Sequence, residues 1–287
     1  MASEVKFMSF SSGSCGNCYL LVLEEEGMLV DGVIIDAGVS VRRLKKELAL
    51  KGYDFDSFSA VLVTHDHLDH IRNLGSYCHR LKKPVYATAT LHRALAEHSF
   101  TRDHIADCRR ILSDDGWTTI CPGRIFARYF VVPHDATQTV GYALLLDGYK
   151  FVIMTDIGDM TGEALAYARN AQTVVIESNF DEHMLLCGPY PYELKMRIIQ
   201  GCGHLSNSKC AQALGTFWHS GLKQVFLCHL SENNNTPELA FRASASALAD
   251  LGFKPTYDKS PLFEKDGESL TLRTLPRETA SPLFRLI

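Results

Sequence analysis

The residues with the clearest chemical potential lie in one short stretch, Thr64-His65-Asp66-His67-Leu68-Asp69-His70. Imidazole and carboxylate groups are the ligands that zinc, manganese and iron take in catalytic sites. His65 and His67 stand two residues apart, so both can face one ion, while Asp69 and His70 follow where they can reach a second ion. A polar loop with chance histidines is the alternative, but histidines rarely cluster as His-x-His-x-Asp-His. The stretch therefore predicts a metal site.

Three further candidates stand at the ends of apolar, strand-like runs, as the motif itself does after Ala60–Val63. They are His134, Asp156 and His229. This repeated pattern favours a shared site at the end of a sheet, with His134 as a third ligand of the first ion. Asp156 can bind one ion with each carboxylate oxygen. Taken alone, His134 or Asp156 is also compatible with a turn.

Asp36 closes another strand-like run, Met28–Ile35, and precedes Ala37-Gly38. A carboxylate at a strand end can hold a metal-binding histidine in place without touching the metal. A turn-forming aspartate before glycine explains the same residue equally well. Both interpretations stay open at this point.

The composition limits the class of protein. The chain has 287 residues, of which 46% are hydrophobic, and a formal net charge of −4. Because no general basic field exists, any contact with nucleic acid must depend on local patches. The nine cysteines are scattered, and neither a secretory signal nor an apolar stretch of about 18 residues is present, so we expect a cytoplasmic protein without a membrane span. No linker or repeat divides the sequence, which predicts one domain over residues 1–287.

Some cysteines and histidines have weaker claims to a function. Cys15-Gly-Asn-Cys18 has redox spacing, but a strand-like run follows it, whereas a redox motif should open a helix. A glycine loop that offers backbone N–H groups to an anion is favoured, and a plain hairpin turn is the alternative. Six histidines without ligand-like neighbours are interpreted as structural or surface residues: His79, His92, His98, His104, His183 and His219.

Apolar periodicity and turn residues predict an alternation of strands and helices. The expected strands are Val5–Phe10, Cys18–Leu23, Met28–Ile35, Ala60–Val63, Pro84–Ala87, Arg110–Leu112, Trp117–Cys121, Arg124–Val132, Tyr142–Asp147, Tyr149–Thr155, Thr173–Ile176 and Gln224–Cys228. The expected helices are Val41–Leu50, Arg72–Leu81, Leu91–Ser99, Gly162–Arg169, Ser208–Ser220 and Pro237–Leu251. The tail, 252–287, is expected to form a hairpin-like or irregular cover.

The order and spacing of these candidates resemble the metallo-β-lactamase superfamily, from about Val5 to Leu251. The resemblance implies an α/β fold, a four-layer αββα sandwich. More narrowly, the chain looks like the YycJ/WalJ branch, also called VicX. The segments that carry this resemblance are Ser12–Asn17, Glu177–Asp181, Tyr190-Pro191, Gly203–Asn207 and His229–Asn234. Cys15 stands where that branch usually has serine, and Phe180 where histidine or tyrosine is common.

The resemblance implies a role for each matching residue. His65, His67 and His134 would hold the first metal, Asp69, His70 and His229 the second, and Asp156 would bridge them. Asp69 counts among the catalytic residues as well. The end of the chain is also similar to ribonuclease Z, which implies that Glu177 and His204 pair for proton transfer. The resemblance further places Asp36 behind the metal ligands. From position alone, Ser14, Asn17, Ser206 and Asn207 are candidate phosphate contacts, although Ser206 or Asn207 can instead cap a helix.

The implied activity is that of a binuclear metal-dependent phosphodiesterase, a DNA 5′-to-3′ exonuclease that uses a metal-bound hydroxide. The cofactors would be two divalent ions per chain, zinc or manganese, with iron also admitted by the donor set. The implied partner is a nucleic acid, DNA. Two other functions stay open: a small-molecule ester, thioester or lactone hydrolase of the same fold, and a metal-holding regulatory protein linked to a cell-wall two-component system.

Overall fold

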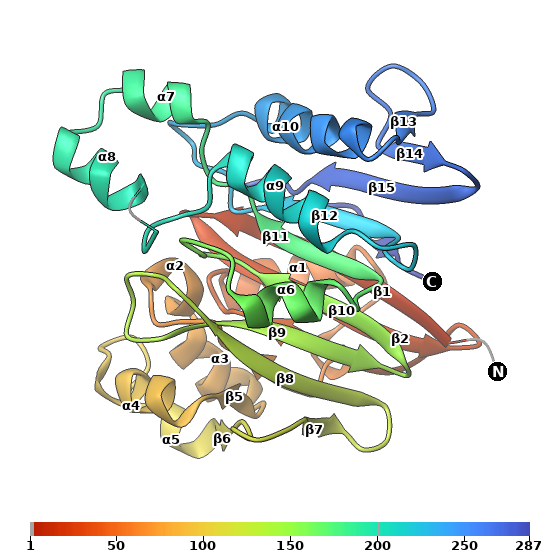
Figure 1. Cartoon of the computed structure of the whole chain (residues 1–287). Helices are drawn as coiled ribbons and strands as arrows, with labels where there is room; N and C mark the ends of the chain where they lie inside the picture. The colour runs from red at the N-terminus through yellow and green to blue at the C-terminus, as the bar shows by residue number, and fades with distance from the viewer. Residues whose placement is uncertain (1–2, 200) are drawn as a thin grey trace. The chain divides into compact units, whose positions relative to one another are not determined.

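The computed structural model describes residues 3–199 and 201–287, and its chain forms two compact units (Figure 1). Unit 1 consists of Met1–Tyr129, Ala136–Tyr149 and Pro276–Ile287, and unit 2 of Phe130–Asp135 and Lys150–Leu275. The prediction of one domain over residues 1–287 stays a prediction. Each unit is described separately below.

Unit 1 contains a seven-stranded sheet in the order β16-β1-β2-β3-β4-β5-β6. Its strands are β1 (Ser3–Gly13), β2 (Gly16–Glu25), β3 (Met28–Ile35), β4 (Ala60–Leu62), β5 (Val85–Ala87), β6 (Arg109–Ile111) and β16 (Phe284–Arg285). β1, β2 and β3 are antiparallel, whereas β3, β4, β5 and β6 run parallel. Because Ile35 pairs with Leu62, the residues that follow β3 and β4 emerge at the same end of the sheet.

The helices of unit 1 cover one face of this sheet. They are α1 (Val41–Ala49), α2 (Leu68–Ile71), α3 (Leu74–Leu81), α4 (Ala89–Glu97) and α5 (Ile105–Cys108), with a short 3₁₀ turn at Phe55–Ser57. Ser40 and Thr88 begin α1 and α4 by accepting hydrogen bonds from backbone N–H groups of the first turn. Unit 1 also holds β7 (Thr118–Cys121), β9 (Thr139–Leu146) and the first part of β8 (Ile125–Val132).

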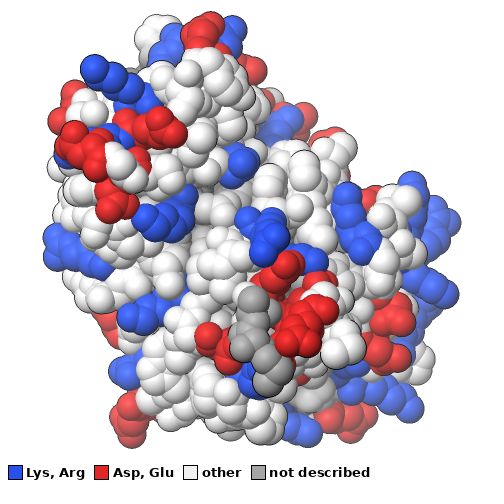
Figure 2. Space-filling model, turned by 90° about the vertical axis from the view of Figure 1, so that its right-hand side faces the viewer, with Lys and Arg blue, Asp and Glu red and all other residues white. Residues whose placement is uncertain are grey.

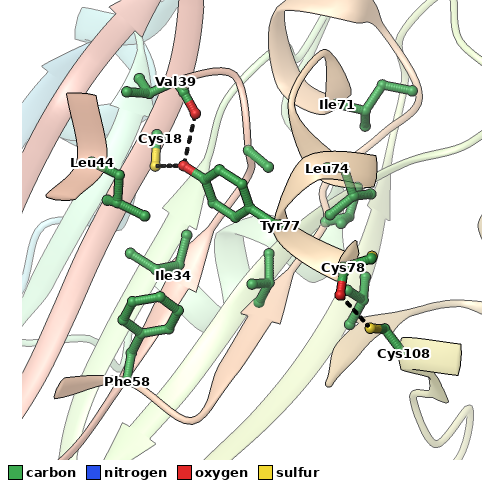
Figure 3. Packing of buried hydrophobic residues seen from close by; sticks show 14 of the residues in the cluster. Cys18, Ile34, Val39, Leu44, Phe58, Ile71, Leu74, Tyr77, Cys78 and Cys108 are labelled. Carbon is green, nitrogen blue, oxygen red and sulfur yellow. Dashed lines mark hydrogen bonds between the residues drawn. The ribbon is translucent and has the colours of Figure 1, made fainter. Parts of the chain in front are cut away.

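The core of unit 1 is apolar, and its buried tyrosine has hydrogen-bond partners (Figure 3). The Tyr77 hydroxyl donates to the carbonyl of Val39 at 2.8 Å and contacts the Cys18 sulfur at 3.8 Å. Burial raises the pKa of Cys18 to about 12. Cys15 is exposed at the β1–β2 turn, where Gly13 pairs with Gly16. The segment between Gly13 and Gly16 is thus a hairpin turn, and Cys15 and Cys18 are not joined by a disulfide. Binding of an anion by its backbone N–H groups stays a prediction.

Unit 2 contains strands in the order β13-β14-β15-β12-β11-β10. β15, β12, β11 and β10 run parallel, whereas β13, β14 and β15 are antiparallel. The strands are β10 (Tyr149–Met154), β11 (Thr173–Glu177), β12 (Gln224–Cys228), β13 (Lys254–Pro255), β14 (Leu262–Lys265) and β15 (Glu268–Thr274). Every residue of β11 is buried, as expected for a parallel strand covered on both faces. Ile176 pairs with Leu227, so the chain beyond both strands continues at one end of the sheet.

The helices of unit 2 are α6 (Gly162–Ala168), α7 (Glu182–Cys187), α8 (Tyr192–Ile199), α9 (Asn207–Phe217) and α10 (Pro237–Asp250). Thr161, Ser206 and Thr236 cap α6, α9 and α10. α7 and α8 were not predicted from the sequence, and no residue of α8 is buried. The strand pairings of the tail were not predicted either: β15 pairs with β12, and β16 pairs with β1.

The face of the molecule drawn in Figure 2 carries charges of both signs. On the face drawn in Figure 2, the described Lys and Arg side chains form small separate groups with Asp and Glu side chains among them. This agrees with the expectation that any nucleic-acid contact depends on local patches. None of the helices within 3–199 and 201–287 is long and apolar enough to cross a bilayer.

Candidate active site

In unit 1 the candidate ligands gather around Asp36, and we call Asn17, Asp36, Thr64, His65, His67, Asp69 and His70 the Asp36 cluster. Asp36 is completely buried and follows β3 with a left-handed φ of 62°. Its Oδ1 accepts the Thr64 backbone N–H at 2.8 Å, and its Oδ2 accepts the Thr64 hydroxyl at 2.8 Å and His70 Nδ1 at 2.7 Å. A non-glycine residue keeps such a conformation only where its surroundings enforce it. Asp36 thus joins the ends of β3 and β4.

The Asp36–His70 contact sets the tautomer of the imidazole. With its Nδ1 proton directed at the carboxylate, neutral His70 has its lone pair on Nε2, the form in which imidazole binds a metal. The Asn17 amide lies 2.9 Å from this Nε2 and donates to Asp69 Oδ2 at 3.0 Å. The arrangement is that of a carboxylate–histidine pair behind a metal.

The other histidines of the motif lie against His70. The ring of His65 is 4.0 Å from that of His70 and 4.7 Å from that of His67, measured between centroids. α2 starts directly after His67, which turns Asp69 back so that its Oδ2 lies 3.4 Å from His70 Nε2. Three imidazoles and one carboxylate therefore converge within this unit.

Gly38 makes this convergence sterically possible. A Cβ atom at this position would lie 1.9 Å from the carbonyl oxygen of Asp69 and 2.4 Å from the backbone nitrogen of Asn17. No side chain fits there, so the segment after Asp36 packs its backbone directly against the motif. The glycine that the sequence suggested as part of a turn also serves as a contact surface.

The Asp66 side chain points away from this metal-ligand group. It accepts hydrogen bonds from the backbone and hydroxyl groups of Thr137, 3.2 Å away at the backbone nitrogen. Asp66 therefore holds the Ala136–Gln138 segment beside the motif. No pattern in the sequence indicated this contact.

In unit 2 five residues form what we call the Glu177 cluster: His134, Asp156, Glu177, His204 and His229. Glu177 ends β11 and is completely buried. Its Oε1 accepts from His204 Nδ1 at 2.7 Å and from His229 Nδ1 at 3.0 Å. Its Oε2 accepts the backbone N–H groups of Ile157 at 2.8 Å and Leu205 at 3.0 Å. Both oxygens are engaged, so Glu177 orients two imidazoles and is poorly suited to be a metal ligand itself.

Asp156 faces the imidazoles of this cluster. It follows β10 with a φ of 54°, and His229 follows β12 with a φ of 53°, both left-handed. The Oδ1 of Asp156 lies 3.4 Å from His229 Nε2 and 3.9 Å from His134 Nε2. His134 Nδ1 donates to the carbonyl of Gly203 at 2.6 Å, which again places the lone pair of neutral imidazole on Nε2.

Protonation differs among these groups because their neighbours differ. Burial acts to lower the pKa of His204, but the charge and hydrogen bond of Glu177, together with Asp156, outweigh it and raise that pKa. Burial acts to raise the pKa of Glu177, yet His204 and His229 lower it overall. Burial lowers the pKa of His134 despite the attraction of Asp156. His204 is thus the imidazole of this cluster that is best suited to carry a proton.

A network of amides, which the sequence analysis missed, supports Glu177 from behind. Asn207 accepts from Ser178 Oγ at 2.7 Å and donates to Asn235 Oδ1 at 2.9 Å. The Asn235 amide donates to the carbonyls of Ser178 and Asn179 at 2.8 and 2.9 Å, and Asn179 donates to the carbonyl of His229 at 2.7 Å. The only sequence signal is a cluster of polar residues after two buried strands.

These contacts bear on the four candidate phosphate contacts. Asn207 and Asn17 are buried within hydrogen-bond networks, and Ser206 caps α9 by accepting from Lys209 N at 3.2 Å. Ser14 is exposed beside Cys15 in the hairpin turn. The first three side chains therefore have structural partners, and a contact with substrate stays a prediction for all four. The cap is the alternative that the sequence had left open for Ser206.

The comparison with known proteins covers most of the chain. Residues 32–230 match the family model described as beta-lactamase superfamily domain. The chain is 33% identical over 262 residues to exodeoxyribonuclease WalJ of Streptococcus pneumoniae serotype 2 (strain D39), covering 89% of this chain and 94% of that protein. It is 33% identical over 247 residues to exodeoxyribonuclease YycJ of Bacillus anthracis, covering 86% and 90%.

The likeness to solved structures concerns the fold. The metallo-β-lactamase fold protein YhfI of Bacillus subtilis has a TM-score of 0.63 and 16% identity, over 98% of this chain and 99% of that one. The predicted fold class is thereby confirmed. With the family match and the two relatives, these findings show that the chain belongs to the metallo-β-lactamase superfamily of metal-dependent hydrolases and, within it, to the WalJ/YycJ branch.

Proposed function

We propose that this protein is a metal-dependent exonuclease that removes nucleotides from the 5′ end of DNA. Two relatives of the same branch carry the name exodeoxyribonuclease and match nearly the whole chain. The observation that carries the proposal is the Glu177–His204 pair, a buried carboxylate bound at 2.7 Å to an imidazole with a raised pKa. An imidazole held in this way can protonate a sugar oxygen as it leaves phosphorus.

The donor set fits two divalent ions. In the proposed assignment His65, His67 and His134 bind one ion, Asp69, His70 and His229 bind the other, and Asp156 binds both. The support from the structure is the state of the histidines: the Nδ1 atoms of His70, His134 and His229 each lie 2.6–3.0 Å from an oxygen acceptor. An imidazole anchored at Nδ1 presents Nε2, as metal-binding histidines do. Zinc and manganese both accept this mixture of imidazole and carboxylate, and iron is admitted by it.

When bound, two such ions would activate a water molecule and stabilise charge on the phosphate. The residues of the chain do the remaining work. Asp36 and Glu177 keep the ligand imidazoles in one tautomer and one orientation. His204 holds a proton opposite the leaving oxygen, a role that contributes about 10²- to 10⁴-fold in rate to general acid catalysis. A poor leaving group such as a sugar alkoxide needs this proton most.

The test uses end-labelled DNA. The protein is loaded with Mn²⁺, and separately with Zn²⁺, and given duplex DNA labelled at one 5′ or one 3′ end, with an RNA of matched sequence. We expect early release of the 5′ label as mononucleotide, and none with Asp69→Ala. Absence of cleavage of every polymer in both metals would reject the proposal. Turnover of ester, thioester or lactone libraries by the same preparations would then assign a small-molecule hydrolase instead, and no turnover at all a metal-holding protein.

A further inference from the structure

Helix α8 borders a hollow that the proposed chemistry does not use. The hollow has a volume of about 490 Å³ and is lined by Tyr192, Glu193, Met196, Arg197 and Cys202. No residue of α8 is buried, and Tyr192 is 75% exposed. In Figure 1, α7 and α8 lie on the far side of α9 and α10 from the β13–β14 hairpin. What distinguishes Tyr192 from other exposed apolar residues is that it lines this hollow.

The backbone ties this hollow to the Glu177 cluster. The backbone N–H of His204 donates to the carbonyl of Ile198, at 3.3 Å, in the last turn of α8. A Cβ atom on Gly203 would lie 2.5 Å from that same carbonyl oxygen and 2.7 Å from the carbonyl oxygen of Arg197. The carbonyl of Gly203 in turn accepts from His134 Nδ1. The hollow therefore lies one short backbone segment away from two candidate site histidines.

The charges of the lining indicate what the hollow can bind. The Arg197 guanidinium forms an ion pair with Asp135, and Glu193 adds a carboxylate. The positive charge is therefore compensated, and a phosphate would meet no net attraction. The rest of the lining is the Tyr192 side chain, the thioether of Met196 and the thiol of Cys202. Flat, weakly polar rings such as nucleobases stack on surfaces of this kind.

We infer that Tyr192 is a stacking platform for a nucleobase of the DNA strand, near the nucleotide that is cleaved. This inference rests on the proposed nuclease function. It assigns a grip on the bases of the strand to α8, because Asp135 compensates the charge of Arg197 that could otherwise hold a phosphate there. Stacking tolerates every base, so the platform provides affinity without sequence preference.

The test combines variants of the protein with lesions in the substrate. Single abasic sites are placed at the first to fourth nucleotides from the labelled 5′ end, and kcat and KM are measured for the wild type, Tyr192→Ala and Tyr192→Phe. We expect Tyr192→Ala to raise KM for intact DNA by about tenfold, Tyr192→Phe to stay near the wild type, and one abasic position to weaken the wild type but not Tyr192→Ala. Turnover of bis(p-nitrophenyl) phosphate, which has no base to stack, should be the same in all three.

The outcomes separate the inference from the function on which it rests. Cleavage of DNA by the wild type, with equal KM for Tyr192→Ala and no sensitive abasic position, would overturn the platform and leave the nuclease intact. Equal losses on DNA and on the aryl phosphate would mean that the substitution disturbs His204 through α8, and would overturn it too. No cleavage of any polymer by the wild type overturns both. A raised KM for Tyr192→Ala with no sensitive abasic position would mean that the ring contacts the strand other than through a base, and would overturn the platform as well.

Discussion

In both the Asp36 cluster of unit 1 and the Glu177 cluster of unit 2 a buried carboxylate orients imidazole rings, but the two carboxylates have different partners. Each has a completely buried carboxylate near the end of a strand. Asp36 itself has a left-handed conformation, whereas in the Glu177 cluster Asp156 and His229 have it. Asp36 accepts a hydrogen bond from one imidazole and two from Thr64. Glu177 holds two imidazoles and two backbone N–H groups. The first arrangement positions a proposed metal ligand, whereas the second also raises the pKa of a histidine outside the proposed ligand set.

The largest effect should come from the histidine that distinguishes the two clusters. His204→Ala is expected to keep its metal and to lose about 10²- to 10⁴-fold in kcat on alkyl phosphodiesters, because the leaving alkoxide is no longer protonated. An activated aryl ester should lose much less. Rates on both ester classes and metal content are measured beside His79→Ala, whose surface ring only contacts His104. Equal losses on both esters would contradict a general-acid role.

A smaller effect is expected from the carboxylate behind the motif. Asp36→Asn has an NH₂ group in place of one acceptor oxygen, so it can no longer accept from the Thr64 backbone N–H and from His70 Nδ1 at the same time. We expect metal affinity to fall by about 10- to 100-fold, with the ratio of alkyl to aryl ester rates unchanged. Glu177→Gln should change that ratio, since His204 loses its charged partner. Metal titrations and the rates on both esters would show whether the two clusters differ in this way. The same change in metal affinity and in the ratio of ester rates for both variants would contradict the different roles of Asp36 and Glu177.

The smallest effect concerns a buried carboxylate without imidazoles. Glu24 accepts hydrogen bonds from Lys6 and the Tyr53 hydroxyl, each at 2.6 Å. Burial acts to raise its pKa, but these two partners lower it below the ordinary glutamate value. Its stabilisation is therefore present above the unfolded-state pKa of about 4.3 and is lost as the pH falls through the lower folded-state pKa.

Glu24→Gln should accordingly cost about 1.5 kcal/mol of unfolding free energy at pH 7, with no change in catalysis. The difference from the wild type should shrink as the pH falls below about 4. Urea unfolding at several pH values measures this. A difference that is constant from pH 7 to pH 3, or a loss of catalysis in this variant, would show that the pairing around Glu24 is not what the structure indicates.

The sequence indicated which residues gather in the two clusters better than it indicated the hydrogen bonds that hold those residues in place. His-x-His-x-Asp-His and the strand-end positions of His134, Asp156 and His229 are local patterns, and β3 and β12 were placed with the bounds that the structure gives them. The pairing of Glu177 with His204 came from resemblance, and the structure brings the two side chains into contact, while their catalytic role stays a prediction. The open question at Asp36 could be judged only from its contacts.

What the sequence could not predict depends on contacts between distant segments. The Asn207–Asn235 network joins residues 28 apart, and nothing in either local pattern requires it. β15 pairs with β12 in the sheet of unit 2, whereas the sequence indicated only a hairpin-like or irregular cover for the tail. The short, exposed helices α7 and α8 have weak local signals, since no apolar stripe is buried beneath α8. Tertiary contacts decided each of these features.

The most direct test of the two-metal assignment is the number of metal ions that each purified protein holds. Native mass spectrometry or plasma emission after metal loading is applied to the wild type, to His67→Ala and Asp69→Ala in the Asp36 cluster, and to His229→Ala in the Glu177 cluster. We expect two ions in the wild type, fewer ions in each of the three variants, and no hydrolysis by any of the variants. Two ions together with wild-type turnover in a ligand variant from either cluster would contradict the assignment.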